Sequence, residues 1–169
     1  MIIVRKIKKS DIYALADMLN KADVRRTLYL DDGKKITYTD QDAWWKDRKK
    51  EAHTLILVAL VDKQVAGAIH LDFYTHEATA NRAKFGMFVD STFWGKGAGR
   101  ALIKHAEQEL AKRGVTRLEA NDIVFSTNKR GLAFYKKIGF RIEGRAKKAL
   151  WFDGKLVDGI YLAKEVSGL

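Results

Sequence analysis

The feature that most constrains this chain is a glycine-rich stretch near its middle, with the order Trp94, Gly95, Lys96, Gly97, Ala98, Gly99, Arg100. Three glycines within five residues allow the backbone to turn sharply and to approach a ligand closely. The stretch matches neither of two better-known glycine loops. No Gly-Lys-Ser/Thr follows, as it does in nucleotide hydrolases, and the glycine spacing is not that of a dinucleotide-binding loop.

The residues on either side predict a strand before the turn and a helix after it. Phe85–Val89 is an apolar run, which indicates a buried strand. Leu102, Ala106 and Leu110 recur at the spacing of one helix face. The helix is expected to end near Gly114, because glycine readily adopts the positive φ that follows a last helical turn.

A strand, a glycine turn and a helix together form a geometry suited to phosphate. The first N–H groups of a helix have no internal partner, and the helix dipole adds partial positive charge there. Lys96 and Arg100 add full charges. The sequence therefore predicts an anion site, and a plain glycine-rich connection is the alternative interpretation.

Length and composition narrow the class of protein. The 169 residues predict one domain, residues 1–169, with a proper core. The absence of cysteine excludes disulfides, thiolate metal sites and cysteine nucleophiles. We find no apolar run long enough for a membrane span, and Met1–Lys6 alternates like a short strand rather than a signal peptide. A cytoplasmic location is the expectation, and the formal net charge of +11 favours anionic partners such as nucleic acid, ribosome or a polyphosphate cofactor.

Hydrophobic periodicity predicts the order β-α-α-β-β-β-α-β-α-β-β, without repeat or linker. This is an α/β (α+β) domain with a mixed, mostly antiparallel sheet of about seven strands and about four helices. Strands are expected at 2–7, 54–61, 65–73, 82–89, 115–125, from 140 and at 155–164, with helices from about 10, at 40–50, from 101 and at 128–137.

Several local features refine this order. Ser10 or Asp11 is expected to cap the first helix. Residues 21–39 are expected to be irregular, with a turn at 31–34. Trp44 and Trp45 cannot share a helix face, so one is expected to be buried and one to line a surface. Gly67 predicts a bulge or a close backbone approach, and residues 153–154, Asp-Gly, predict a hairpin turn.

The chain resembles the GNAT superfamily of acyl-CoA-dependent N-acyltransferases over essentially its whole length. Phe88-Val89 leads into the Trp94–Gly99 loop, which is similar to the family's Arg/Gln-x-x-Gly-x-Gly/Ala motif. Asn128 precedes Tyr135 by seven residues, and 133–140 is similar to Ala-x-x-Tyr-x-x-x-Gly-Phe. The C-terminal part, with its Asp-Gly turn, is similar to the branch of ribosomal-protein and amino-acid acetyltransferases.

The resemblance implies roles for individual residues. The backbone of Phe88 and Val89 would bind the pantetheine arm of acetyl-CoA as an extra half-strand. The amides of Gly95–Arg100 would hold the pyrophosphate. Asn128 would bind pantetheine or orient the thioester, and Tyr135 would protonate the departing thiolate. No metal is implied, and transfer would be direct, in a ternary complex.

Two departures from the family pattern concern the same site. Trp94 stands where many members have Arg or Gln, although the loop uses mainly its backbone. The interval from Arg117 to Asn128 is longer than usual, which predicts a bulge or a longer loop. This longer interval also leaves open which residue stands where some members of the family have a glutamate general base. Counting back from Asn128 gives Ile123, which cannot titrate. Glu119, Asn121, Asp122 or a water chain remain as alternatives.

Alternative roles for these residues stay open. Without the resemblance, Tyr135 on an apolar helix face is typical of a core tyrosine, and with it a catalytic role is favoured. Asn128 is also typical of a helix cap. The histidines, at 53, 70, 76 and 105, have no metal-ligand spacing, and a solvent-exposed role is expected for those at 70 and 76. The basic run 145–148 is typical of a solvated strand face, or of a guide for an anionic ligand.

The sequence thus predicts an acetyl-CoA-dependent N-acetyltransferase acting on a primary amine: a protein N-terminus, an amino acid or another small amine. Specificity for the acceptor amine is expected to depend on residues 21–50, 73–81 and the final hairpin, because loops are the parts that vary on a shared scaffold. The rivals are a CoA-binding sensor without turnover and a basic ribosome- or RNA-binding module, although no nucleic-acid motif is found. A homodimer is plausible from family habit.

Overall fold

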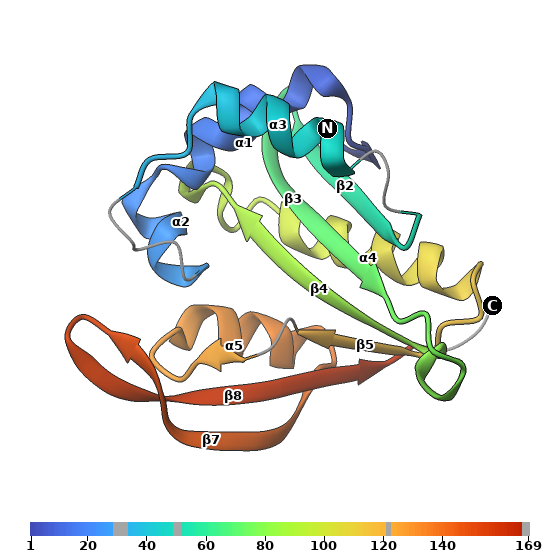
Figure 1. Cartoon of the computed structure of the whole chain (residues 1–169), viewed down its shortest axis with the longest axis vertical. Coiled ribbons are helices and arrows are strands. Elements are labelled where there is room, and N and C mark those ends of the chain that lie inside the picture. The colour runs from blue at the N-terminus through green and yellow to red at the C-terminus, as the bar shows by residue number, and fades with distance from the viewer. Residues whose placement is uncertain (29–33, 49–51, 121–122, 167–169) are drawn as a thin grey trace. The chain divides into compact units, whose positions relative to one another are not determined.

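A computed structural model describes residues 1–28, 34–48, 52–120 and 123–166 of the chain (Figure 1). Short 3-10 helices occupy Lys9–Asp11, Glu77–Thr79 and Ser91–Phe93. The other elements follow the order β1 (Ile2–Lys6), α1 (Ile12–Leu19), α2 (Ala22–Thr27), α3 (Tyr38–Arg48), β2 (Thr54–Val61), β3 (Gln64–Phe73), β4 (Arg82–Val89), α4 (Ala98–Ala111), β5 (Arg117–Ala120), β6 (Val124–Phe125), α5 (Lys129–Lys137), β7 (Arg141–Phe152) and β8 (Lys155–Glu165).

The hydrogen-bonded strand order is β1-β2-β3-β4-β5-β8-β6, with β7 paired to β8. The pairs β1–β2, β2–β3, β5–β8, β6–β8 and β7–β8 are antiparallel, whereas β4 and β5 run parallel. The predicted α+β class with a mixed, mostly antiparallel sheet is therefore confirmed. The described residues form eight strands and five α-helices, one of each more than the sequence predicted.

The extra helix is α2, which lies in a stretch expected to be irregular. It has only six residues, too few for a visible apolar period, and a helix this short is not stable alone. Val24 is buried within it, so tertiary packing holds the helix. The turn predicted at residues 31–34 falls mostly outside the described residues.

The extra strand arises because the predicted strand 115–125 is divided into β5 and β6. Glu119 pairs with Ala163 of β8, and Val124 pairs with Ile160. Five steps along the chain from Glu119 to Val124 thus correspond to three steps along β8, so this segment is two residues longer than the part of β8 opposite it. The surplus falls within the interval between Arg117 and Asn128 for which a bulge or a longer loop was predicted.

Two smaller predictions were wrong in detail. Trp44 and Trp45 are both partly buried, with ring centroids 6.5 Å apart, so neither is the core residue that helix geometry suggested. Asp11 precedes α1 but does not cap it with its side chain. Its carboxylate instead accepts from the Lys8 amide at 2.7 Å and pairs with Arg5 at 2.7 Å and 2.8 Å.

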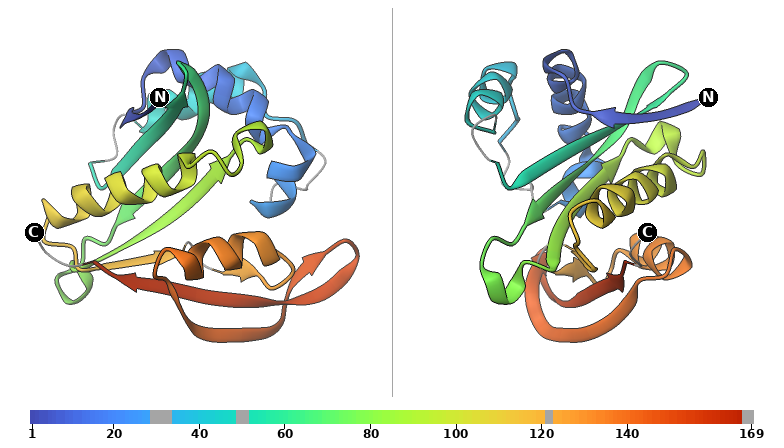
Figure 2. Two further views of the ribbon diagram at one scale, coloured as in Figure 1. Left: turned by 180° about the vertical axis from the view of Figure 1, so that it is seen from behind. Right: turned by 90° about the vertical axis from the view of Figure 1, so that its right-hand side faces the viewer.

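The chain divides into two compact units. The first comprises Met1–Asp72 and Met87–Ala106. In its core, Leu15 and Met18 of α1 pack with Val58 and Ala68 from β2 and β3. α1 and α3 cover one side of these strands and α4 the other (Figure 2). The predicted apolar face of α4 is confirmed, because Leu102 and Ala106 are completely buried.

The second unit comprises Phe73–Gly86 and Glu107–Leu169. β8 is its central strand, with β5 and β6 on one edge and β7 on the other. Asp153 and Gly154 have φ values of 49° and 71°, so the predicted hairpin turn joins β7 to β8. No helix in the described ranges combines the length and apolar character that crossing a membrane requires.

Candidate functional site

The C-terminal end of β4 is fixed by an unusually close contact with β3. A Cβ on Gly67 would lie 2.4 Å from the carbonyl oxygen of Phe88 and 2.9 Å from the Cα of Val89. The neighbouring amide of Asp90 donates to the carbonyl of Ala66 at 2.9 Å. The predicted close approach at Gly67 is confirmed, and it sets the position of the two residues expected to bind pantetheine.

Asp90 then connects β4 to the glycine loop. Asp90 is buried, with 4 % of the residue exposed, and its carboxylate accepts from the amide and hydroxyl of Thr92, at 3.0 Å and 2.9 Å. Lys21, which precedes α2, donates to the other oxygen at 2.5 Å. Burial alone raises the pKa of Asp90, but these hydrogen bonds outweigh it and hold the pKa below its usual value. Sequence reasoning missed this link, which joins residues far apart in the chain and has no local signature.

Trp94 occupies the first position of the loop. Its indole Nε1 donates to the carbonyl oxygen of Val89 at 2.8 Å, so the side chain bridges the loop back to the end of β4. The residue as a whole remains 39 % exposed. A tryptophan at this position therefore organises the loop through a backbone contact.

The glycine loop has the predicted conformation. Gly95 and Gly97 have φ values of 74° and 90°, which favour glycine over other residues. α4 begins at Ala98, and the Ala101 amide donates to the carbonyl of Gly97 at 3.0 Å. The amides of Ala98–Arg100 lie ahead of the helical ladder, as an anion site needs. The side chains of Lys96 and Arg100 are exposed.

In the second unit, Asn128 caps α5. Its Oδ1 accepts from the Gly131 amide at 2.9 Å, and a Cβ on Gly131 would lie within 3 Å of the Asn128 side chain. The capping alternative for Asn128 is thus confirmed. A cap and a ligand contact are compatible, because the amide nitrogen of the side chain is a separate donor.

Tyr135 lies on α5 in an aromatic cluster. Its ring centroid is 5.7 Å from that of Phe85, edge to face, and 5.4 Å from that of Phe140. Burial raises the pKa of Tyr135 to about 12. We find no hydrogen bond from its hydroxyl to any described residue of the same unit. Tyr135 as a whole is only partly buried, so its ring packs against core aromatics while the neutral hydroxyl remains a donor.

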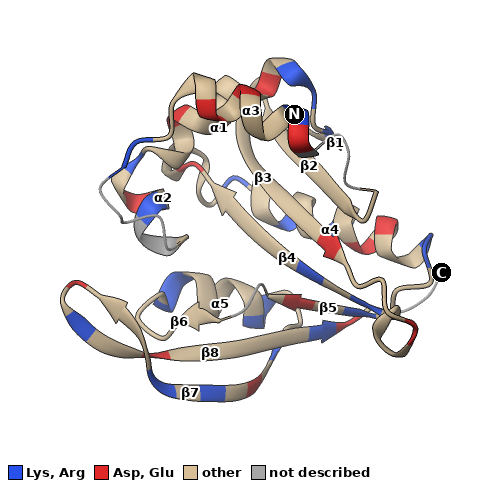
Figure 3. Cartoon of the chain, in the orientation of Figure 1, with Lys and Arg blue, Asp and Glu red and all other residues tan. Residues whose placement is uncertain are grey.

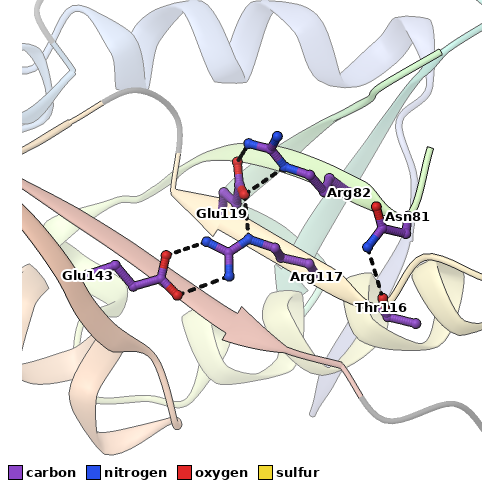
Figure 4. A network of polar contacts seen from close by, with 6 residues as sticks. All are labelled: Asn81, Arg82, Thr116, Arg117, Glu119 and Glu143. Atoms are coloured by element: carbon purple, nitrogen blue, oxygen red, sulfur yellow. Dashed lines mark hydrogen bonds and ion pairs between the residues drawn. The ribbon is translucent and has the colours of Figure 1, made fainter. Parts of the chain in front are cut away.

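Glu119, one of the bases considered from the sequence, is held by two arginines (Figure 4). Arg82 contacts it through two hydrogen bonds of 2.9 Å and 2.8 Å, and Arg117 Nε donates at 2.5 Å. Arg117 also pairs with Glu143. Burial raises the pKa of Glu119, but the hydrogen bonds from the two arginines outweigh the effect of burial, so the pKa is lowered overall. A carboxylate so stabilised is a poor proton acceptor.

The remaining positions considered for the general base are 121, 122 and 123. Ile123 cannot titrate, and its side chain packs where a Cβ on Gly159 would fall, 2.0 Å from its Cγ2. Asn121 and Asp122 lie outside the described residues. Among the described residues no cluster of His, Cys, Asp and Glu is arranged to hold a metal ion.

The histidines correct one expectation. His76 is exposed and caps a 3-10 helix, accepting from the Ala78 amide at 3.2 Å. His70, by contrast, is only 25 % exposed in its side chain, and its Nε2 lies 3.0 Å from the carboxylate of Asp72. The expected solvent-exposed role for His70 is therefore wrong. Its spacing of two residues from Asp72 on a strand was the signal available in the sequence.

Comparisons with known proteins agree with this arrangement. The family model described as Acetyltransferase (GNAT) family matches residues 16–140. The L-amino acid N-acetyltransferase AaaT of Escherichia coli is 32 % identical over 125 residues, which cover 73 % of this chain and 76 % of that protein.

Solved structures show the same fold. The ribosomal-protein-alanine N-acetyltransferase of Brucella melitensis has a TM-score of 0.81 at 24 % identity, over 96 % of this chain and 99 % of that one. yncA of Salmonella typhimurium, solved with its cofactor acetyl-CoA, has a TM-score of 0.79 at 17 % identity, over 100 % and 96 % of the two chains. Because the family model spans most of the sequence, the chain belongs to the GNAT family of acetyltransferases.

Proposed function

We propose that this acetyl-CoA-dependent acyltransferase moves the acetyl group directly from acetyl-CoA to a primary α-amine, that of a free amino acid or of a protein N-terminus. The observation that carries the proposal is the strand, glycine turn and helix of 85–111 in a chain of the GNAT family. Direct transfer needs no covalent enzyme intermediate, only a neutral amine, a polarised thioester and a stabilised leaving thiolate.

The loop is proposed to bind the cofactor. The amides of Gly95 and of Gly97–Arg100, with the charges of Lys96 and Arg100, suit the pyrophosphate of acetyl-CoA. The Lys96 amide itself donates to the Phe93 carbonyl at 3.3 Å. The backbone of Phe88 and Val89 is proposed to hold the pantetheine arm. The Val89 carbonyl already accepts from Trp94, but a carbonyl oxygen has a second lone pair for a ligand.

Tyr135 is proposed to act on the leaving sulfur. A thiol has an ordinary pKa of about 8.5, below the value of about 12 to which burial raises the pKa of Tyr135. The hydroxyl therefore keeps its proton before reaction. It stabilises the developing thiolate by a hydrogen bond. It passes its proton to the sulfur only as the nitrogen gives up the proton that restores the hydroxyl.

The acceptor class rests on the relatives. AaaT is named for L-amino acids, and the Brucella melitensis enzyme for the alanine of a ribosomal protein. Both acceptors are α-amines, in which the amine and a carbonyl group are attached to the same carbon. This shared chemistry supports an α-amine over a polyamine for the present chain.

The charge distribution supports an enzyme over a nucleic-acid module. Acidic residues are interspersed with Lys and Arg along β5 and β8, whereas β7 carries a single acidic residue, Glu143, among its basic ones (Figure 3). Arg145 pairs with Asp158 at 2.5 Å, and Lys164 with Glu107 at 2.5 Å. A nucleic-acid surface instead requires one face of clustered, available basic side chains.

The test is release of thiol from acetyl-CoA in the presence of L-amino acids, peptides with a free N-terminal alanine, or polyamines. The chain has no cysteine, so a thiol reagent reports only CoA. Release that requires an α-amine supports the proposal, and release that requires a polyamine overturns the acceptor class. If no acceptor promotes release while CoA still raises the melting temperature, the chain is a CoA-binding sensor.

A further inference from the structure

The proposed cofactor segment is tied by one side chain to a part of the chain far from it in sequence. Lys21 Nζ donates to Asp90 Oδ2 at 2.5 Å. Asp90 directly follows Val89, whose backbone is proposed to hold pantetheine. All three residues belong to the first compact unit. The proposed acetyl transfer gives this link no role.

Asp90 needs a positive partner because it is buried. With 4 % of the residue exposed, its carboxylate has little access to water, and a buried charge is costly unless it is paired and hydrogen-bonded. Thr92 satisfies one oxygen through its amide and hydroxyl. Lys21 supplies the positive charge to the other oxygen. Removing the Lys21 ammonium group therefore leaves a buried carboxylate without this counter-charge.

The backbone of Lys21 begins α2. Its carbonyl oxygen accepts from the amides of Val24 and Arg25, at 3.1 Å and 2.9 Å. Asn20, the preceding residue, exchanges two hydrogen bonds of 2.7 Å and 2.8 Å with the backbone of Ile36. α2 has six residues, too few to be stable alone, so its order depends on contacts such as these. A restraint on the Lys21 side chain therefore acts on the first turn of α2.

On the other side of the link, Asp90 begins a series of turns that leads into the glycine loop. Its carbonyl oxygen accepts from the Phe93 amide at 2.9 Å, and the Phe93 carbonyl accepts from the Lys96 amide at 3.3 Å. α4 begins two residues later, at Ala98. The position of Asp90 is thus passed along the backbone to the loop amides.

We propose that Lys21 is a positioning residue that couples α2 to the cofactor segment, so that binding of acetyl-CoA and the order of residues 22–28 strengthen each other. This rests on the proposed cofactor site. Because coupling is reciprocal, a cofactor that fixes the glycine loop also fixes Asp90 and, through Lys21, the start of α2. α2 lies within residues 21–50, where acceptor specificity is expected, so the bound cofactor organises part of that stretch.

Hydrogen exchange tests the coupling directly. In the wild-type protein, saturating CoA is expected to slow exchange of the amides of residues 22–28. In Lys21→Met, CoA at saturation should leave these amides as exposed as before, whereas Lys21→Arg keeps the charge and should keep the protection. Lys9→Met is the matched control, because it removes an exposed ion pair with Asp42, 3.7 Å long, in the same unit. It should behave as the wild type.

The affinity for CoA gives a second measurement. We expect Lys21→Met to raise the Kd for CoA by about 5- to 150-fold, the usual range for coupling between two sites. Adding Asp90→Asn to Lys21→Met should recover part of the affinity. A neutral amide oxygen still accepts from Thr92 and leaves no unpaired charge in the interior. A merely structural loss at Lys21 is not relieved by a second substitution.

Exchange of residues 22–28 that does not respond to CoA in the wild-type protein overturns the proposal, even where Lys21→Met fails to fold. A folded Lys21→Met protein with the same Kd for CoA as Lys9→Met overturns it as well. If the wild-type protein does not bind CoA at all, the proposed cofactor site fails instead, so the two failures are distinguishable.

Discussion

Tyr135 illustrates how a single side chain can serve both packing and chemistry. Its ring contacts Phe85 and Phe140, while burial raises the pKa of its hydroxyl to about 12. Phenylalanine keeps the ring and removes only the hydroxyl. The two contributions can therefore be separated by one substitution.

Tyr135→Phe is expected to lower kcat by about 10², because the leaving thiolate loses its hydrogen-bond donor. The KM for acetyl-CoA and the melting temperature should change little, since the aromatic cluster is kept. Steady-state thiol release measures kcat and the KM for acetyl-CoA, and thermal unfolding measures the melting temperature. Full activity in the variant contradicts the role proposed for the hydroxyl.

Trp94 shows a different use of a large side chain. Its indole N–H bonds the Val89 carbonyl and so fixes the loop on the end of β4. Trp94→Phe removes that bond, worth about 0.5–1.5 kcal/mol. We expect the KM for acetyl-CoA to rise several-fold with little change in kcat.

Trp151→Phe is the control for that substitution, since Trp151 is 70 % exposed on the β7–β8 hairpin. It should leave the KM for acetyl-CoA at the wild-type value. Equal kinetics in the Trp94 and Trp151 variants would show that the indole contact does not position the loop.

At the scale of elements, the contact between β3 and β4 depends on one glycine. In Gly67→Ala the new Cβ would meet the backbone oxygen of Phe88, which a side-chain rotation cannot relieve. We expect a loss of about 1–3 kcal/mol in the free energy of unfolding, measured by urea denaturation. Gly86→Ala on β4 is the control, because nothing lies within 4 Å of its Cβ position. A Gly67 variant as stable as the Gly86 variant contradicts the close approach.

The arginine network joins β4, β5 and β7 through Glu119 and Glu143. The pKa of Glu119 is lowered in the folded protein from an ordinary value of 4.5. Its contribution to stability is thus complete above pH 4.5 and is lost as pH falls below that value, through the lower folded-state pKa.

Glu119→Gln is expected to reduce the free energy of unfolding at neutral pH by about 1–3 kcal/mol. The free energy of unfolding of the variant should also decrease less than that of the wild type as the pH is lowered into the acid range. Denaturation followed over a series of pH values measures both effects. An unchanged acid dependence in the variant would assign acid sensitivity to other carboxylates, such as Asp11 or Asp90, whose pKa values are also lowered.

Whether the sequence could predict an element or a contact depends on how far apart in the chain the interacting residues lie. β2, β4 and α4 were predictable because their apolar periods are long. The Gly67 contact was predictable because a glycine inside a strand typically marks a bulge or a close backbone approach. α2 was not, because six residues show no period. The bond from Lys21 to Asp90 and the arginine network also escaped prediction, since they join segments that only the fold brings together.

At the scale of the whole molecule, the family fixes the reaction class, while the acceptor depends on segments that carry no motif. Residues 29–33 and 49–51, within the stretch expected to set specificity, lie outside the described part of the chain. The acceptor is therefore best identified by chemistry, and the cysteine-free sequence makes that measurement simple.

The most direct measurement counts, in one reaction, the CoA thiol released and the N-acetylated amine formed, the latter by mass spectrometry. Direct transfer predicts equal amounts of the two products, with formation of both dependent on an α-amine acceptor. Thiol release without an acetylated amine, or no release with any acceptor, would contradict the account that this chain is an amine acetyltransferase.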